Sequence, residues 1–264
     1  MKFTYDHDLH IHSQISLCSD DPDQTPDDIL KYAKDNNLNT IVVTDHYWDE
    51  KASEAEDIFY KLQGFERISK SRPLPQAEGI RFLFGCETEM DRNFNIGIVP
   101  ERYDEFDFII VPTTHYHIDC TVHKEEMASL EGRARTWCSK FEALLNKDLP
   151  FHKTGFAHLI CSSIGRDDTD KVMDLIPDEE YKRLFTIAAK KGLGIELNSF
   201  DIEDTLTHNE KSLFRPFAIA KECGCKFYLG TDSHHPADFP RAKALFERAI
   251  DYLGLEESDK FILK

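Results

Sequence analysis

Residues 5–13 read Tyr-Asp-His-Asp-Leu-His-Ile-His-Ser, an extended stretch in which two histidines are separated by one residue. Side chains alternate between the two faces of a strand, so His10 and His12 point the same way. Two imidazoles that converge on one point are typical of a metal site, because imidazole nitrogen is a common ligand of zinc and similar ions. Such a pair also occurs by chance, but the residues that end the later strands extend the pattern.

Short apolar and β-branched runs alternate with longer stretches of helical periodicity along the whole chain. The expected strands are Tyr5–Ile11, Thr40–Thr44, Ile80–Cys86, Asp107–Pro112, Gly155–Cys161, Leu193–Leu197 and Lys226–Leu229. The expected helices cover residues 26–37, 52–70, 123–147, 178–191, 208–223 and 238–253. This alternation implies parallel strands joined by right-handed crossovers. No Gly-rich phosphate loop follows the first strand, so the pattern favours a closed (β/α)7 barrel over a dinucleotide-binding sheet.

Length and composition are those of a water-soluble α/β enzyme. The 264 residues show no linker or break in composition, and we expect one domain spanning residues 1–264. No segment approaches the roughly 20 apolar residues of a membrane span, and the N-terminus does not resemble a signal peptide. Seven cysteines without disulfide spacing suggest reduced thiols. We therefore expect a cytoplasmic protein with no membrane partner.

The chain is strongly acidic, with 49 acidic against 32 basic residues and a formal net charge of −17. A surface of this charge repels phosphate backbones, so long nucleic acids are not expected as partners.

Each expected strand ends in, or is followed by, a side chain that can bind metal or orient a ligand. These residues are His10, His12, Asp45, His46, Glu87, His115, His158, Glu196, Asn198, Asp232, His234 and His235. The C-terminal ends of barrel strands share one face, so the pattern predicts a metal centre there. Mixed imidazole and carboxylate donors suit zinc, manganese or iron, and their number exceeds the needs of one ion. Two or three divalent metal ions are therefore expected, with Asp45 orienting an imidazole rather than binding metal.

The motifs resemble those of the PHP (polymerase and histidinol phosphatase) superfamily. They are His10-Ile11-His12-Ser13, Thr44-Asp45-His46, Gly85-Cys86-Glu87, the isolated His115 and His158, and Gly230-Thr231-Asp232-Ser233-His234. The resemblance runs in order through nearly the whole chain. It implies a distorted, TIM-like (β/α)7 barrel with a trinuclear metal centre that hydrolyses phosphoesters.

The resemblance also implies how the ligands are divided among three ions. The first ion would bind His10, His12, Glu87 and Asp232, the second Glu87, His115 and His158, and the third His46, His234 and the residue six beyond His12. That residue is Cys18, where relatives usually have His or Asp. A thiolate is a competent zinc ligand, and the neighbouring Asp20 or Asp21 is the alternative.

On this basis we expect a histidinol-phosphatase-like enzyme that hydrolyses a small phosphomonoester by a metal-activated hydroxide. Glu87 would bridge two ions, and Asp232 or His234 would relay a proton to the leaving group. Phosphate recognition favours guanidinium groups, and Arg166 and Arg135 are the candidates. Asn198 either faces the substrate or caps a turn.

Two other functions stay open at this point. The amidohydrolase superfamily also opens with two histidines on its first strand, but it would have a bridging lysine at the end of the fourth strand, which is lacking here. A metal-loaded barrel could also bind a phosphorylated ligand without catalysis, although the nearly complete ligand set argues against this.

Overall fold

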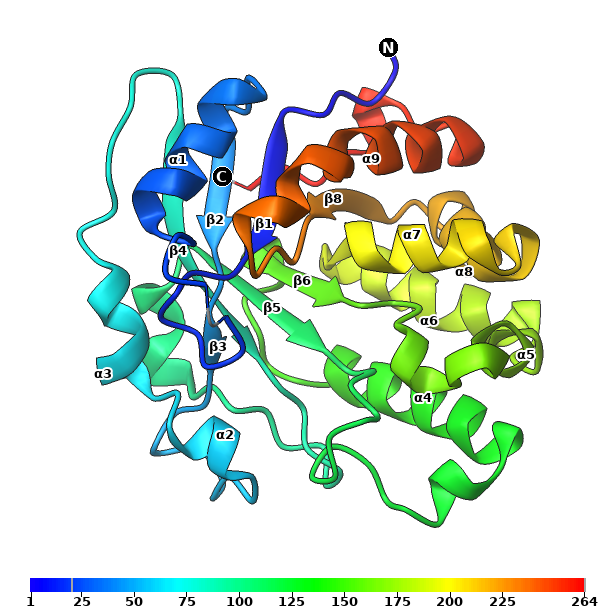
Figure 1. Ribbon diagram of the computed structural model, residues 1–264. Coiled ribbons are helices and arrows are strands. Elements are labelled where there is room, and N and C mark those ends of the chain that lie inside the picture. The colour runs from blue at the N-terminus through cyan, green and yellow to red at the C-terminus, as the bar shows by residue number, and fades with distance from the viewer. Residues whose placement is uncertain (20, 264) are drawn as a thin grey trace.

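The computed structural model describes residues 1–19 and 21–263 (Figure 1). Its sheet consists of parallel strands in the order β1 (His7–Ile11), β2 (Thr40–Val43), β4 (Arg81–Thr88), β5 (Phe108–Pro112), β6 (Thr154–Ala157), β7 (Gly194–Asn198) and β8 (Lys226–Gly230). The short strand β3 (His46–Tyr47) pairs with the far end of β4. Each expected strand is present, and the predicted fold class, a distorted (β/α)7 barrel, is confirmed.

The barrel closes between β1 and β8, the two ends of the hydrogen-bonded strand order. The main-chain N–H of Asp232 donates to the oxygen of His10 at 2.7 Å, and that of His12 donates to the oxygen of Ser233 at 3.0 Å. The buried carboxylate of Asp8 joins the same strands, because it accepts bonds from the N–H of Thr231 at 3.0 Å and from its hydroxyl at 2.7 Å. A side chain therefore supplies, between β1 and β8, part of the hydrogen bonding that the main chain supplies between the other strands.

Helices pack against the outside of the strands (Figure 1). The longer ones are α1 (Pro26–Asp35), α4 (Leu130–Leu145), α6 (Asp178–Lys191), α7 (Ser199–Thr207), α8 (Glu210–Glu222) and α9 (Phe239–Leu253). Thr25 caps α1 by accepting a bond from the N–H of Asp28, which agrees with the helix start read from the sequence. Aromatic side chains fill the layer between helices and sheet, as where Phe141 of α4 lies 4.5 Å from Phe156 of β6 between ring centroids.

Two expected helices are shorter than predicted. Residues 52–70 contain only the short helices α2 (Ile58–Lys61) and α3 (Phe65–Ile68) and the start of a 3-10 helix (Ser69–Ser71). Gly64, which is extended with ψ of 173°, separates α2 from α3. The helix expected over 123–147 begins at Leu130, where the Ser129 side chain accepts a bond from the N–H of Gly132. Neither α5 (Thr169–Asp174) nor α7 was predicted from the sequence.

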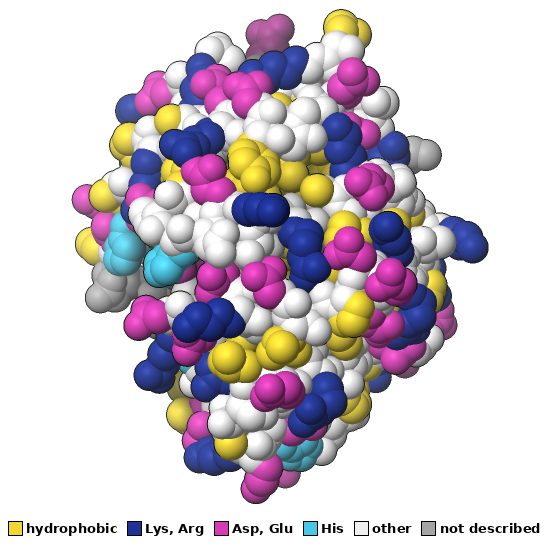
Figure 2. All heavy atoms as spheres, turned by 90° about the vertical axis from the view of Figure 1, so that its right-hand side faces the viewer, with side chains coloured by type: hydrophobic (Ala, Val, Ile, Leu, Met, Phe, Trp, Pro, Cys, Tyr) yellow, Lys and Arg dark blue, Asp and Glu magenta, His cyan; other side chains and the backbone are white. Residues whose placement is uncertain are grey.

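The outer surface intersperses charges of both signs. On the face turned to the viewer in Figure 2, acidic and basic side chains alternate with small apolar areas. No helix among the described residues is long and apolar enough to cross a membrane.

Replacement of Asp8 tests the closure of the barrel. Asp8→Ala leaves the buried donors of Thr231 and of the Tyr32 hydroxyl, 3.0 Å from Asp8, without their acceptor. We expect the free energy of unfolding to fall by about 3 kcal/mol, since each buried group without a partner costs on the order of 1–3 kcal/mol. Urea denaturation measures this change. Asp251→Ala, which removes an exposed ion pair with Lys2, is the control and should change stability by less than about 1 kcal/mol; equal effects of the two variants would contradict the assignment.

Candidate metal centre

The C-terminal ends of the strands bring all the predicted metal ligands to one end of the barrel. Around a cavity of about 600 Å³ lie Cys18, His46, Glu87, His115, His158, Asp232 and His234. His10 and His12 are fully buried beside them. Two of these residues depend on unusual backbone geometry, since His158 and Asp232 have positive φ angles of 54° and 53°. Such conformations cost about 1–3 kcal/mol in non-glycine residues and concentrate at functional sites.

The first group of ligands has the spacing of a zinc site. His10 Nε2 and His12 Nε2 lie 3.2 Å apart, and Asp232 Oδ1 lies 3.2 Å from the former and 3.1 Å from the latter. Glu87 Oε2 lies 3.2 Å from His12 Nε2. Zinc–ligand distances of about 2.0–2.2 Å place neighbouring ligand atoms of a tetrahedron roughly 3.3 Å apart. His10 and His12 therefore fit one ion, with Glu87 and Asp232 each placing an oxygen beside them.

The second group uses the remaining oxygens of the same two carboxylates. Glu87 Oε1 lies 3.7 Å from His158 Nε2, and Asp232 Oδ2 lies 3.4 Å from it. His115 completes the group, because Glu87, His115 and His158 each place a ligand atom within 4.8 Å of the others. Glu87 thus directs one oxygen to each group, which is the arrangement of a bridging ligand.

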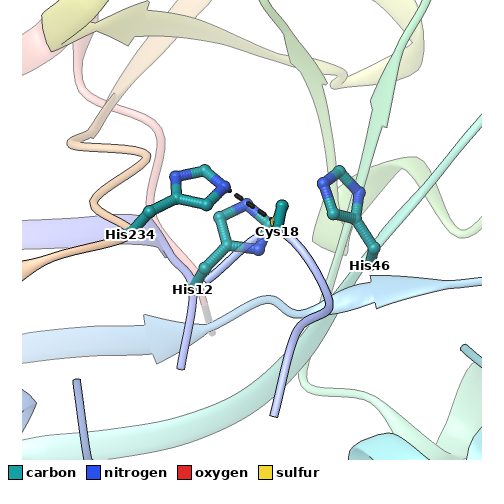
Figure 3. Close-up of side chains that lie close together, drawn as sticks. All are labelled: His12, Cys18, His46 and His234. Atoms are coloured by element: carbon teal, nitrogen blue, oxygen red, sulfur yellow. Dashed lines mark hydrogen bonds between the residues drawn. The ribbon is translucent and has the colours of Figure 1, made fainter. Parts of the chain in front are cut away.

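The third group contains a thiol and imidazoles. Cys18, His46 and His234 turn towards one another in Figure 3, together with His12 of the first group. His234 Nε2 lies 3.0 Å from Cys18 Sγ. The side chain of Asp21, one of the two alternatives to Cys18, lies 3.5 Å from His235 Nδ1 and is not part of the group. Asp20, the other alternative, lies outside the described residues.

Three buried carboxylates face the far side of the imidazoles. The pairs and their distances are Glu196 Oε1 to His10 Nδ1 at 2.7 Å, Glu89 Oε2 to His115 Nδ1 at 2.7 Å, and Asp201 Oδ2 to His158 Nδ1 at 3.8 Å. A carboxylate that accepts the Nδ1 proton fixes the tautomer and leaves Nε2 free for metal, as Glu196 does for His10 and Glu89 for His115. Asp201 is too far from His158 Nδ1 for a hydrogen bond. Glu196 was predicted from the sequence as a strand-end residue, whereas Glu89 and Asp201 were not predicted.

Asp45 does not have the predicted role of orienting an imidazole. Its carboxylate accepts bonds from the N–H and the hydroxyl of Ser13, both at 2.7 Å. It therefore anchors the loop that follows β1.

The groups shift one another's protonation. Burial lowers the pKa of His12, but contacts with Asp232 and Glu87 raise it to about 9. Burial raises the pKa of Glu87, yet the surrounding imidazoles hold it well below its usual range. Burial and the charge of His12 lower the pKa of His234 to about 3, which leaves a neutral imidazole.

The carboxylate of Glu87 fits a metal better than it fits hydrogen-bond donors. Both of its oxygens are buried, and neither receives a hydrogen bond of good geometry from a described residue. Buried charges of this kind are normally paired or coordinated to metal. The side chains of the three ligand groups can therefore accommodate divalent ions.

The predicted substrate-binding residues do not form the cavity wall. Arg135 and Arg166 are exposed and lie outside it, although Arg166 lines a small adjoining hollow with Ser162 and Asp204. Asn198 has the capping role that the sequence left open, because its Oδ1 accepts a bond from the N–H of Phe200 at 2.9 Å. Within residues 1–19 and 21–263, the cavity is lined by acidic, aromatic and imidazole side chains without lysine or arginine.

Comparisons with known proteins agree with the fold. The sequence matches the PHP domain family over residues 8–200. The histidinol phosphate phosphatase of Lactococcus lactis, solved with zinc, L-histidinol and phosphate, is 18% identical with a TM-score of 0.55, over 92% of this chain and 93% of that chain. A protein of Listeria monocytogenes provisionally described as a histidinol phosphatase is 13% identical with a TM-score of 0.62, over 91% and 99% of the two chains. No curated protein sequence matches significantly.

Replacement of Glu89 tests the orientation of His115. Glu89→Gln removes the charged acceptor of the Nδ1 proton, so we expect affinity for one metal ion to fall by about 10- to 100-fold. Competition with a chromogenic chelator measures the affinity. Tyr60→Phe removes the other side chain that donates to Glu89 Oε2, at 3.0 Å, and leaves the imidazole pair intact. Equal losses in the two variants would contradict the role of Glu89.

Proposed function

Because the chain belongs to the PHP domain family, we propose that it is a metal-dependent phosphoesterase acting on a small phosphomonoester. The observation that carries the proposal is the carboxylate of Glu87, whose two oxygens face two different groups of metal ligands. Phosphoester hydrolysis uses paired ions because one can serve the attacking oxygen and the other the leaving oxygen. The zinc and phosphate found with the Lactococcus lactis protein are consistent with this chemistry.

The proposed centre holds two or three ions of zinc, manganese or iron. Bound ions of this kind supply a water molecule of lowered pKa and neutralise charge on the phosphoryl oxygens. His10, His12 and Asp232 would hold the first ion, His115 and His158 the second, with Glu87 shared between them.

The proposed hydrolysis also requires a side chain that transfers a proton. His234 Nδ1 lies 2.7 Å from the main-chain oxygen of Asp232, to which it donates, so Nε2 keeps its lone pair towards Cys18. His234 therefore fits a ligand better than a proton donor. Asp232, which also lines the cavity, is our candidate for accepting the proton of the attacking water and passing it to the leaving group. Because its two oxygens face the first and second ligand groups, this role requires that one of them binds no ion.

The cavity suits a small phosphorylated substrate. Its volume of about 600 Å³ lies within the range of small-molecule sites, and Phe59, Ile118 and Phe200 give it apolar walls. The acidic side chains of Asp57 and Asp204 at the same cavity would repel a long polyanion.

The alternative of an amidohydrolase-type enzyme finds less support. It would place a lysine at the metal centre, but the cavity has none among the described residues. The buried Lys140 instead donates to the main-chain oxygens of Met90 and Thr121 at 2.9 and 3.0 Å. A non-catalytic role in binding phosphorylated ligands is the other alternative, and the completeness of the ligand groups argues against it.

Turnover by the metal-loaded protein tests the proposal. We expect hydrolysis of phosphomonoesters with zinc or manganese, and little action on amides. Glu87→Gln should lower kcat/KM by about 1,000-fold, since the ions stabilise the transition state by several kcal/mol, and should lower the bound metal by up to about two ions per chain. Elemental analysis measures the second effect.

Glu203→Gln serves as the matched control, because Glu203 lies at the cavity but pairs with Arg241 at 2.9 Å. It should keep the full metal content. A fully metallated protein that turned over no phosphoester would refute the proposal, and turnover of amides alone would support the amidohydrolase alternative.

A further inference from the structure

We infer that Cys18 makes the third ligand group a thiolate site, which selects zinc or a similarly soft ion over manganese and magnesium. This inference deepens the proposed function and rests on it, because it concerns the metal of the same centre. Its basis is the donor set. Cys18, His46 and His234 offer one sulfur and two imidazoles, and Glu87 Oε2 lies 2.9 Å from His46 Nδ1. The other two groups each contain carboxylate oxygens of both Glu87 and Asp232 and no sulfur.

The loop around Cys18 is held in place on both sides of the thiol. The N–H of Leu17 donates to Gln63 Oε1 at 3.1 Å, and the hydroxyl of Ser19 donates to the main-chain oxygen of His234 at 2.7 Å. The second bond ties the cysteine directly to the loop that carries His234. The close approach of Cys18 and His234 is thus built into the fold.

A buried nitrogen gives independent support for an ion in this region. His12 is fully buried, and its Nδ1 atom has no hydrogen-bond partner among the described residues. The His12 ring stacks on that of His234 with 4.2 Å between centroids, and it lies beside Cys18 in Figure 3. Buried polar atoms normally have a partner, so a buried imidazole nitrogen without one, in a cluster of imidazoles and a thiol, points to a cation. The thiol itself has the Ser16 hydroxyl 3.2 Å from Sγ.

The chemistry of the donors decides which cation. Soft thiolate ligands favour zinc and related ions, whereas carboxylate and water ligands suit manganese and magnesium. A chain supplied with both metals should therefore retain zinc at Cys18 while the carboxylate-containing groups accept either ion.

A second thiol at the cavity provides a stringent comparison. Cys161 forms another possible metal group with His158 and Asp201, and its Sγ lies 3.2 Å from the Ser163 hydroxyl. The Cys161 group contains one imidazole, that of His158, whereas the possible ligands around Cys18 include three imidazoles, those of His12, His46 and His234. The geometry favours Cys18 as the thiolate ligand.

Cobalt substitution distinguishes the two cysteines. The metal-free protein, reconstituted with Co²⁺, should show a sulfur-to-cobalt charge-transfer absorption in the near ultraviolet. We expect this band to persist in Cys161→Ser and to vanish in Cys18→Ser and Cys18→Asp. After dialysis against excess Mn²⁺, the zinc-loaded wild type and Cys161→Ser should retain about one more zinc ion per chain than either Cys18 variant. Circular dichroism checks that each variant is folded. If Cys18→Ser does not fold, Cys18→Asp provides a second replacement of the same thiol.

The outcomes separate this inference from the proposed function. A band that persists without Cys18, a band that is lost in Cys161→Ser, or no band in any form would overturn the thiolate assignment. None of these results depends on turnover. Conversely, a wild type that shows the band but hydrolyses no phosphoester would leave the thiolate site standing and refute the proposed reaction.

Discussion

The charge of one buried carboxylate constrains the whole centre. Glu87 lies near the end of β4 with its side chain almost fully buried, and four imidazole nitrogens approach it, from His46 at 2.9 Å to His158 at 3.7 Å. The loss of hydration of a buried carboxylate costs several kcal/mol unless opposite charge compensates it. Metal cations bound by the adjoining ligand groups would compensate this cost more fully than the imidazoles do, because the buried imidazoles have also lost their hydration. The fold and the metals are therefore energetically linked, because ions that bind only the folded chain stabilise it.

Close packing at the end of β8 holds the residues of the metal centre in place. Gly230 at the end of β8 shows how closely the parts fit, since a Cβ there would lie 2.1 Å from Glu196 Oε1 and 2.6 Å from the Cβ of His10. Only glycine leaves room for Glu196 to reach His10 Nδ1. The chain then turns through the positive φ of Asp232, which aims its carboxylate at both ligand groups. The residues that close the barrel are thus the same residues that shape the metal centre.

The sequence predicted the strands and the residues that gather at the candidate metal centre for a common physical reason. Buried parallel strands are short apolar runs, and a polar residue at the end of such a run stands out against them. Glu89 could have been found by the same logic, because it lies two residues beyond Glu87 on the same side of the chain. Asp201 could not, since it belongs to α7, a helix whose start depends on the Asn198 cap rather than on a clear apolar period. The helix predicted over 52–70 was wrong, since it begins only at Ile58, after the Asp57 cap, and is interrupted at the extended Gly64.

The described cavity wall lacks cationic side chains, so in the proposed reaction an acidic protein would depend on bound ions to hold phosphate. Arg135 and Arg166 were predicted from what phosphate usually requires, yet the described cavity wall contains imidazoles and carboxylates instead. With a net charge of −17 and such a wall, the chain alone would repel a phosphoryl group. The positive field must therefore come from the ions, whose charges dominate a site of this kind. Affinity for phosphate and affinity for metal are consequently two aspects of one equilibrium, and each must strengthen the other by the same factor.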